Sequence, residues 1–151
     1  MKNTNEMEII FDSFSANEGF IRVSVAAFLT QLNPTVEEVA DVKTAVSEAV
    51  TNAIIHGYEG EIQKVKVKCW LEDETFYVEV ADSGKGIADV KKAMEPLYTS
   101  KPELERSGMG FSFMEAFMDS VHVSSTPGEG TSVRMTKIIG RERTAWNTQL
   151  L

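Results

Sequence analysis

A change in the period of the hydrophobic pattern at Gly57 constrains the fold more than any other feature of the chain. Over residues 39–54, apolar side chains recur at helical spacing, which predicts a long helix with one buried face. Over 64–71 and 76–80, apolar and polar residues alternate instead, with a turn between them, which predicts a hairpin with one buried face. Because each element has one apolar face to cover, a layer of helices must pack on a layer of sheet.

Shorter patterns predict the other elements. Thr35 and Glu38 have the spacing of a capping box and mark the start of the long helix. Asn17 is expected to cap an earlier helix over 18–31. We expect four residues of that helix to face inward: Phe20, Val23, Ala27 and Phe28. The remaining elements are an edge strand over 7–12, a short helix over 89–94, a buried helix over 111–118, and a hairpin from 121–123 and 133–135.

Together these elements indicate an α+β protein, a two-layer α/β sandwich with helices on one face of a mixed, mostly antiparallel sheet. The 151 residues suit one domain over 1–140, followed by a polar C-terminal tail over 141–151. The segment 95–110 has no clear period and contains two prolines. Long irregular segments in small domains are usually either functional lids or disordered, and we expect Glu95–Ser107 to form a mobile lid.

Composition excludes several classes of function. Fifteen basic residues against twenty-three acidic ones give a net charge of −8, so there is no broad footprint for nucleic acid or an anionic membrane. The single cysteine, Cys69, excludes an internal disulfide and a multi-cysteine zinc site. Apolar runs fall far short of the roughly 18 residues that a membrane span needs. The first ten residues lack the core of a signal peptide, so we expect a cytoplasmic protein.

Two polar patterns flank the change of period. Glu48, Asn52 and His56 are spaced i, i+4 and i+8, so they share one face of the long helix. A solvated polar stripe would look the same. Asp82 ends the hairpin in an Asp-x-Gly-x-Gly pattern, and glycines there allow a ligand to approach the backbone closely. An ordinary turn is the competing interpretation.

Two glycine patterns lie further along the chain. Arg106–Gly110 reads Arg-Ser-Gly-Met-Gly and leads into a helix, where free amides and the helix dipole attract phosphate. A lid hinge would also place glycines here. Gly130-Thr131 opens the last strand and is, taken alone, a hairpin signal.

In this order the four patterns resemble the N, G1, G2 and closing boxes of the GHKL ATPases, which have the Bergerat ATP-binding fold. The resemblance spans about 8–138. Two segments are similar, more narrowly, to the anti-sigma F factors of spore-forming bacteria, which are serine protein kinases: Ser47–Tyr58 (SEAVTNAIIHGY) and Pro96–Phe111 (PLYTSKPELERSGMGF). The stress-response anti-sigma B factors are the nearest relatives, and their lid is a poorer match.

The resemblance implies a role for each residue of the two boxes at the base. Asp82 would accept a hydrogen bond from the adenine amino group, and Thr131 would lie beside the same base. Gly84 and Gly86 would let the base and sugar approach the backbone. The expected ligands are therefore ATP and ADP.

The other two boxes would serve the phosphates. By resemblance, Asn52 would bind Mg²⁺, and Glu48 would take the proton from an attacking serine hydroxyl. The residues expected to hold the phosphates are Arg106, Ser107, Gly108, Met109 and Gly110.

The resemblance also implies partners. With ATP bound, the protein would hold a sporulation sigma factor (sigma F) away from RNA polymerase, and it would phosphorylate an anti-anti-sigma antagonist on serine. A homodimer is expected, because two copies bind one sigma factor in the family. Arg22 would belong to the surface shared by sigma factor and antagonist, with a solvated arginine as the alternative.

Two other classes of function stay open at this point. A histidine-kinase catalytic domain would carry the same boxes, but neither histidine has the flanks of a phosphotransfer site. A binding module that has lost catalysis would have the same fold, but Glu48, Asn52 and Asp82 are all present.

Overall fold

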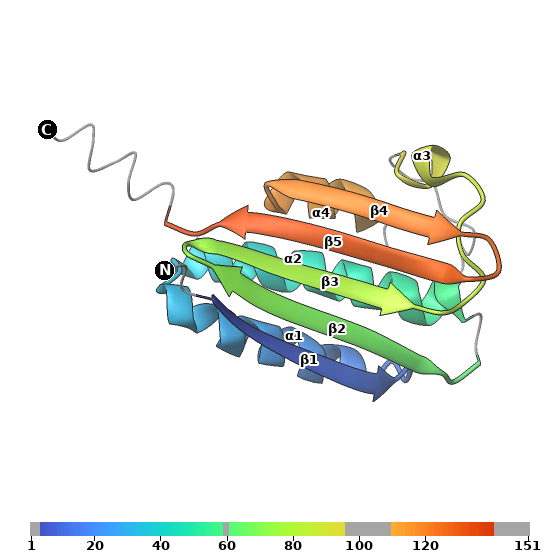
Figure 1. Cartoon of the computed structure of the whole chain (residues 1–151), viewed down its shortest axis with the longest axis horizontal. Coiled ribbons are helices and arrows are strands. Elements are labelled where there is room, and N and C mark those ends of the chain that lie inside the picture. The colour runs from blue at the N-terminus through green and yellow to red at the C-terminus, as the bar shows by residue number, and fades with distance from the viewer. Residues whose placement is uncertain (1–3, 59–60, 96–109, 141–151) are drawn as a thin grey trace, which may run out of the picture.

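The computed structural model describes residues 4–58, 61–95 and 110–140, which form two layers (Figure 1). In this part of the chain one layer is a five-stranded sheet in the order β1-β2-β3-β5-β4, and each of its four pairings is antiparallel. β1 is an edge strand, as predicted. The strands are β1 (Thr4–Asp12), β2 (Lys64–Glu72), β3 (Thr75–Asp82), β4 (Ser120–Thr126) and β5 (Gly130–Ile138).

The second layer consists of helices that cover one face of the sheet (Figure 1). α2 lies in the middle, in contact with α1 on one side and α4 on the other. The helices are α1 (Asn17–Leu29), α2 (Val36–Asn52), α3 (Val90–Ala93) and α4 (Gly110–Phe117); a 3₁₀ turn (Thr30–Leu32) extends α1 and a π-helical turn (Ala53–Gly57) extends α2. This confirms the predicted two-layer α+β sandwich. In the described ranges, no helix is both long and apolar enough to cross a membrane.

The hydrophobic core lies between α2 and the sheet. α2 starts at the predicted capping box, in which the N–H of Glu38 donates to Thr35 Oγ1 at 3.0 Å and the N–H of Thr35 donates to Glu38 Oε1 at 2.8 Å. Burial of apolar side chains between the two layers is the main force that holds the layers together. The buried apolar residues of α2 and of the central hairpin are Val42, Ala45, Val46, Ala49 and Val50, with Val65, Val67, Cys69, Leu71, Phe76, Val78 and Val80.

α1 buries a different face from the one that we predicted. Ile21, Val25 and Leu29 are fully buried, whereas Phe20 and Val23 remain 64% and 58% exposed. The prediction was wrong because this helix has two apolar stripes, and the aliphatic one, with a strict spacing of four, packs against α2.

The start of α1 also differs from the prediction. Asn17 is the first residue of the helix, and Ala16 occupies the N-cap position. The side-chain amide of Asn17 instead donates to the carbonyl oxygen of Asp12 at 2.8 Å. Asn17 therefore joins the end of β1 to the start of α1.

Three elements meet at one end of the sheet, on the right in Figure 1. β3 ends there at Asp82, β5 begins there at Gly130, and the π-helical turn after α2 contacts both strands. The apolar stripe of α2 faces the sheet. Its polar face is therefore available to line a cavity at this end of the sheet.

Candidate functional site

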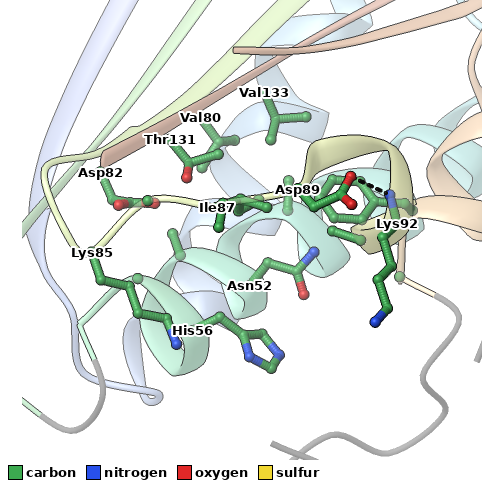
Figure 2. A pocket seen from close by; sticks show the side chains of 18 of the residues that line it. Asn52, His56, Val80, Asp82, Lys85, Ile87, Asp89, Lys92, Thr131 and Val133 are labelled. Atoms are coloured by element: carbon green, nitrogen blue, oxygen red, sulfur yellow. Dashed lines mark hydrogen bonds between the residues drawn. The ribbon is translucent and has the colours of Figure 1, made fainter. Parts of the chain in front are cut away.

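A cavity of about 580 Å³ lies at this end of the sheet (Figure 2). Its size is within the range of about 300–1,000 Å³ that is usual for small-molecule sites. The polar face of α2 and its π-helical turn form one wall, and the ends of β3 and β5 form the opposite one. The labelled side chains around it are Asn52, His56, Val80, Asp82, Lys85, Ile87, Asp89, Lys92, Thr131 and Val133.

Asp82 marks one end of the cavity. Its backbone pairs with Val65 in β2 and with Thr131 in β5, and the N–H of Gly84 donates to its Oδ1 at 2.9 Å. Burial raises the pKa of this carboxyl, and backbone hydrogen bonds from Gly84 and Thr131 partly oppose that rise. A partly buried carboxylate is a strong hydrogen-bond acceptor for a donor group on a ligand.

The two predicted glycines after Asp82 are required by the surrounding backbone. A Cβ on Gly84 would lie 1.9 Å from the carbonyl oxygen of Gly57. Gly86 has a φ of +77°, and its Cβ would lie 2.4 Å from the carbonyl oxygen of Thr126. The loop is therefore pressed between the π-helical turn and the β4–β5 turn, which accounts for both glycines.

Ser125 supports two residues of this wall and was missed by sequence reasoning. Its Oγ accepts a hydrogen bond from the N–H of Ile87 at 2.7 Å and lies 2.9 Å from the hydroxyl of Thr131. Ser125 and Thr131 are paired across β4 and β5. The only signal that could have revealed Ser125 is this strand pairing, which a local pattern does not contain. Thr131 is the β5 partner of Asp82, so the two residues lie side by side at the end of the sheet.

Asn52 and Gly110 line the other end of the cavity, and Glu48 lies close to Gly110. Asn52 lines it from the last turn of α2, and Glu48 lies one turn earlier. Gly110, the first residue of α4, is packed so closely that a Cβ there would lie 3.3 Å from Asn52 Nδ2 and 3.3 Å from Glu48 Oε2. The predicted N box and the last glycine of the third box are thus brought together.

Four of the predicted phosphate-binding residues, Arg106, Ser107, Gly108 and Met109, lie outside the described residues, as does nearly all of the expected lid. No group of three or more His, Cys, Asp or Glu side chains that could hold a metal ion occurs within 4–58, 61–95 and 110–140.

Two lysines, Lys85 and Lys92, also line the cavity and were not among the predicted site residues. Lys85 follows Gly84 in the loop, and Lys92 belongs to α3. The N–H of Lys92 donates to Oδ1 of Asp89, which caps α3 and so fixes the start of this short helix (Figure 2). A lysine is an ordinary surface residue in a sequence pattern, so nothing in the local sequence distinguishes these two.

Arg22 is not part of this cavity. It lies on α1, and its Nε is 3.8 Å from Oε1 of Glu18, one turn earlier. Its neighbours Phe20 and Val23 are exposed. The structure thus places Arg22 on an outward part of α1, apart from the residues described above.

Comparisons with known proteins agree on one family. The histidine kinase-like ATPase domain family matches residues 16–137. An anti-sigma F factor from Thermoanaerobacter sp. (strain X514) is 57% identical over 95% of this chain and 100% of its own length. The anti-sigma F factor of Bacillus subtilis (strain 168) is 51% identical over 95% of this chain and 99% of its own length.

Solved structures support the fold. The RsbU and RsbW domains of Rv1364c from Mycobacterium tuberculosis match with a TM-score of 0.64 and 20% identity, over 89% of this chain and 32% of that one. The histidine kinase domain of a blue-light activated kinase from Erythrobacter litoralis matches with a TM-score of 0.50 and 17% identity, over 84% of this chain and 63% of that one. The family match and the sequence relatives show that the chain belongs to the histidine kinase-like ATPase family and, within it, to the anti-sigma F factors.

Proposed function

We propose that this protein is an ATP-dependent serine protein kinase that also sequesters a sporulation sigma factor. The observation that carries the proposal is one cavity lined by Asp82 at one end and by Asn52 and Gly110 at the other, with Glu48 close to Gly110. In this proposal a single nucleotide would occupy the cavity, with its base at Asp82 and its phosphates at Asn52. The identity of 51–57% to anti-sigma F factors supports the biological role.

At the base end, Asp82 would accept a hydrogen bond from the exocyclic amino group of adenine. Guanine presents a carbonyl oxygen at that position, so a carboxylate acceptor disfavours it. Thr131 would contact the same base, directly or through a water. Val80 and Val133 line the cavity close by and provide apolar surface for the flat base.

At the phosphate end, the donor set fits Mg²⁺. This ion prefers oxygen ligands, takes few of them from the protein, keeps several waters and completes its shell with substrate phosphates. The side-chain amide of Asn52 offers one such oxygen, next to the carboxylate of Glu48 and the buried Gly110. When bound, the ion would neutralise charge on the phosphates. The amides of Ser107, Gly108, Met109 and Gly110, with the side chain of Arg106, would hold the phosphates.

Glu48 is the proposed general base. The serine oxygen of the antagonist would attack the γ-phosphorus, the bond from that phosphorus to the β–γ bridging oxygen would break, and the serine proton would pass to Glu48. The products are phosphoserine and ADP. Because phosphoryl transfer depends mainly on positioning and charge neutralisation, Glu48 would contribute only part of the rate enhancement.

The partners follow from the same proposal. A sigma F-like factor and its anti-anti-sigma antagonist would bind a homodimer, with Arg22 on the shared surface. The net charge of −8 favours protein partners over nucleic acid or a membrane. Because a sigma factor acts on RNA polymerase, the protein would work in the cytoplasm.

The test is to mix the full chain with γ-labelled ATP and Mg²⁺, then add sigma F, its antagonist, or both. We expect acid-stable label on a serine of the antagonist, and co-purification of sigma F that is stronger with ATP than with ADP. Acid-labile label would indicate a histidine kinase. ATP binding without any transfer would indicate a binding module, and either result would contradict the proposal.

A further inference from the structure

The two residues after His56 contact the loop that carries Asp82 at three places. The carbonyl oxygen of Gly57 accepts a hydrogen bond from the N–H of Lys85 at 2.9 Å. The hydroxyl of Tyr58 accepts one from the N–H of Ser83 at 2.7 Å. The Cα of Gly57 also lies against the carboxyl group of Asp82, because a Cβ there would be 2.8 Å from Cγ, 2.9 Å from Oδ1 and 3.0 Å from Oδ2.

Tyr58 connects this loop to a second strand. Its side chain is 5% exposed, and its hydroxyl donates to the carbonyl oxygen of Lys64 at 2.5 Å while it accepts from Ser83. Lys64 begins β2, and the next residue, Val65, is the β2 partner of Asp82. The buried Tyr58 hydroxyl therefore bridges Ser83, which follows Asp82, and Lys64, which precedes the strand partner of Asp82.

The local backbone makes this junction possible. The residues Ala53–Gly57 form a π-helical turn at the end of α2, a conformation that is uncommon and frequent at functional sites. Gly57 and Tyr58 follow directly from the helix that carries Glu48 and Asn52. The base end and the phosphate end of the cavity are thus attached to one continuous segment, 36–58.

We propose that Gly57 and Tyr58 are positioning residues that hold the carboxylate of Asp82 in the place where it reads the adenine amino group. The inference rests on the proposed function, in which Asp82 is that reader. Gly57 lines the cavity, but the role proposed for both residues acts through Asp82 and not through contact with the base. They act by orienting the Ser83–Lys85 backbone and by leaving no space for the carboxyl group to rotate toward Gly57.

The test compares two nucleotides that differ only in the group Asp82 reads. ATP carries the 6-amino group, and purine riboside triphosphate lacks it, so the ratio of their dissociation constants with Mg²⁺ measures that single contact. Removal of the Tyr58 hydroxyl in Tyr58→Phe frees the Ser83 N–H and lets the loop shift. Hydrogen bonds weaken steeply with poor geometry, so we expect the preference for ATP to fall by about tenfold.

Gly57→Ala is the second variant, and it perturbs the carboxyl group without removing a hydrogen bond. The added methyl group meets only the end of the Asp82 side chain within 3.0 Å, which can rotate away, and alanine suits a helical turn. We expect the same loss of preference for ATP, with affinity for purine riboside triphosphate unchanged. Should Tyr58→Phe fail to fold, this variant decides the question.

Tyr77→Phe is the matched control. Tyr77 lies in β3 on the sheet face away from the cavity, stacked on Trp70, and its hydroxyl is 3.5 Å from a carboxylate oxygen of Glu72. This control should keep the wild-type ratio. In an Asp82→Asn background, Tyr58→Phe should produce no further loss of preference, because residues that act through one contact are not additive.

The outcomes are distinct. A wild-type preference for ATP that both Tyr58→Phe and Gly57→Ala retain in full would overturn the inference and leave the proposed function intact. A wild-type chain that binds both nucleotides equally would remove Asp82 as the adenine reader, and with it both the proposed base recognition and this inference.

Discussion

The two ends of the cavity are built in different ways. At the base end, Asp82 is fixed by backbone, through strand pairing with Val65 and Thr131 and through the N–H of Gly84. At the phosphate end, Glu48 and Asn52 are side chains on one face of a helix, and Gly110 of α4 lies close to both.

This difference separates recognition from reaction. A group that must read one atom of a ligand gains from rigid backbone support, because hydrogen-bond strength depends steeply on geometry. Groups that bind a cation and accept a proton need the right chemical type and correct spacing, which a helix provides at i and i+4. Substitutions at the base end should therefore change affinity, and those at the phosphate end should change rate.

The largest effect is expected at the phosphate end. Glu48→Gln keeps the shape and removes the basicity, so transfer to the antagonist should slow by about 10²–10⁴-fold, or roughly 3–5 kcal/mol at the transition state. Affinity for ATP and for sigma factor should survive. Single-turnover transfer at saturating ATP, measured beside nucleotide affinity, checks this.

The control for that variant is Glu37→Gln, an exposed carboxylate in the first turn of the same helix, which should transfer phosphate at the wild-type rate. Near wild-type transfer by Glu48→Gln would exclude Glu48 as the base. Equal losses of affinity and rate would mean that Glu48 only orients Asn52, and the contrast between the two ends would fail.

Asp82→Asn should have the next largest effect, on affinity. The amide can offer only one oxygen to the adenine edge and the backbone, where the carboxylate offers two. Loss of a hydrogen bond to a charged acceptor costs about 1.5–3 kcal/mol, which is roughly 10- to 150-fold in the dissociation constant. Calorimetric titration with Mg²⁺-ATP measures it, and Asp73→Asn in the β2–β3 turn, at a φ of 54° that asparagine tolerates, is the matched control. Unchanged ATP affinity would remove Asp82 from base recognition.

The sequence predicted the helix-built end better than the backbone-built end. The spacing of Glu48 and Asn52 and the capping box at Thr35 are both patterns of residues close together in the sequence. Both were therefore predicted from the sequence alone. Ser125 and Tyr58 act across the fold, on Ile87 and on Ser83, and no periodicity links residues so far apart. Asp82 itself was identified from its glycines, but its supports were not.

The same limit explains the error in α1. Two apolar stripes run along that helix, and the choice between them depends on what α2 presents to it. Phe20 was assigned to the core and is 64% exposed. A helix with one apolar stripe, such as α2, leaves no such choice, and its buried face was predicted correctly.

A substitution at Arg22 tests a region that lies outside both ends of the cavity. Arg22→Glu should leave ATP affinity and the ATP preference unchanged and should weaken binding of sigma factor or antagonist by about tenfold at low salt, with a smaller effect as salt screens the charge. Arg134→Glu, on the sheet face beside Glu79 and Trp70, is the control and should bind both partners normally. Pull-downs unaffected by Arg22→Glu would identify Arg22 as a solvated partner of Glu18.

The smallest effect concerns the stability of the free protein and again singles out the base end. Burial raises the pKa of Asp82 above its ordinary value of 3.8, so the folded state holds this proton more tightly than the unfolded chain does. Protonated Asp82 therefore stabilises the folded state below its ordinary pKa. This stabilisation is lost as pH rises through the raised pKa of the folded state. Asn at this position never ionises, so Asp82→Asn should gain thermal stability relative to wild type as pH rises from about 4 to neutrality, although it binds ATP more weakly. Melting temperatures across that range resolve the difference, since 1 kcal/mol moves the midpoint of a domain of this size by about 2–4 °C. Parallel curves for variant and wild type would show that the carboxylate is no strain on the fold, and that backbone support at the base end fully offsets its burial.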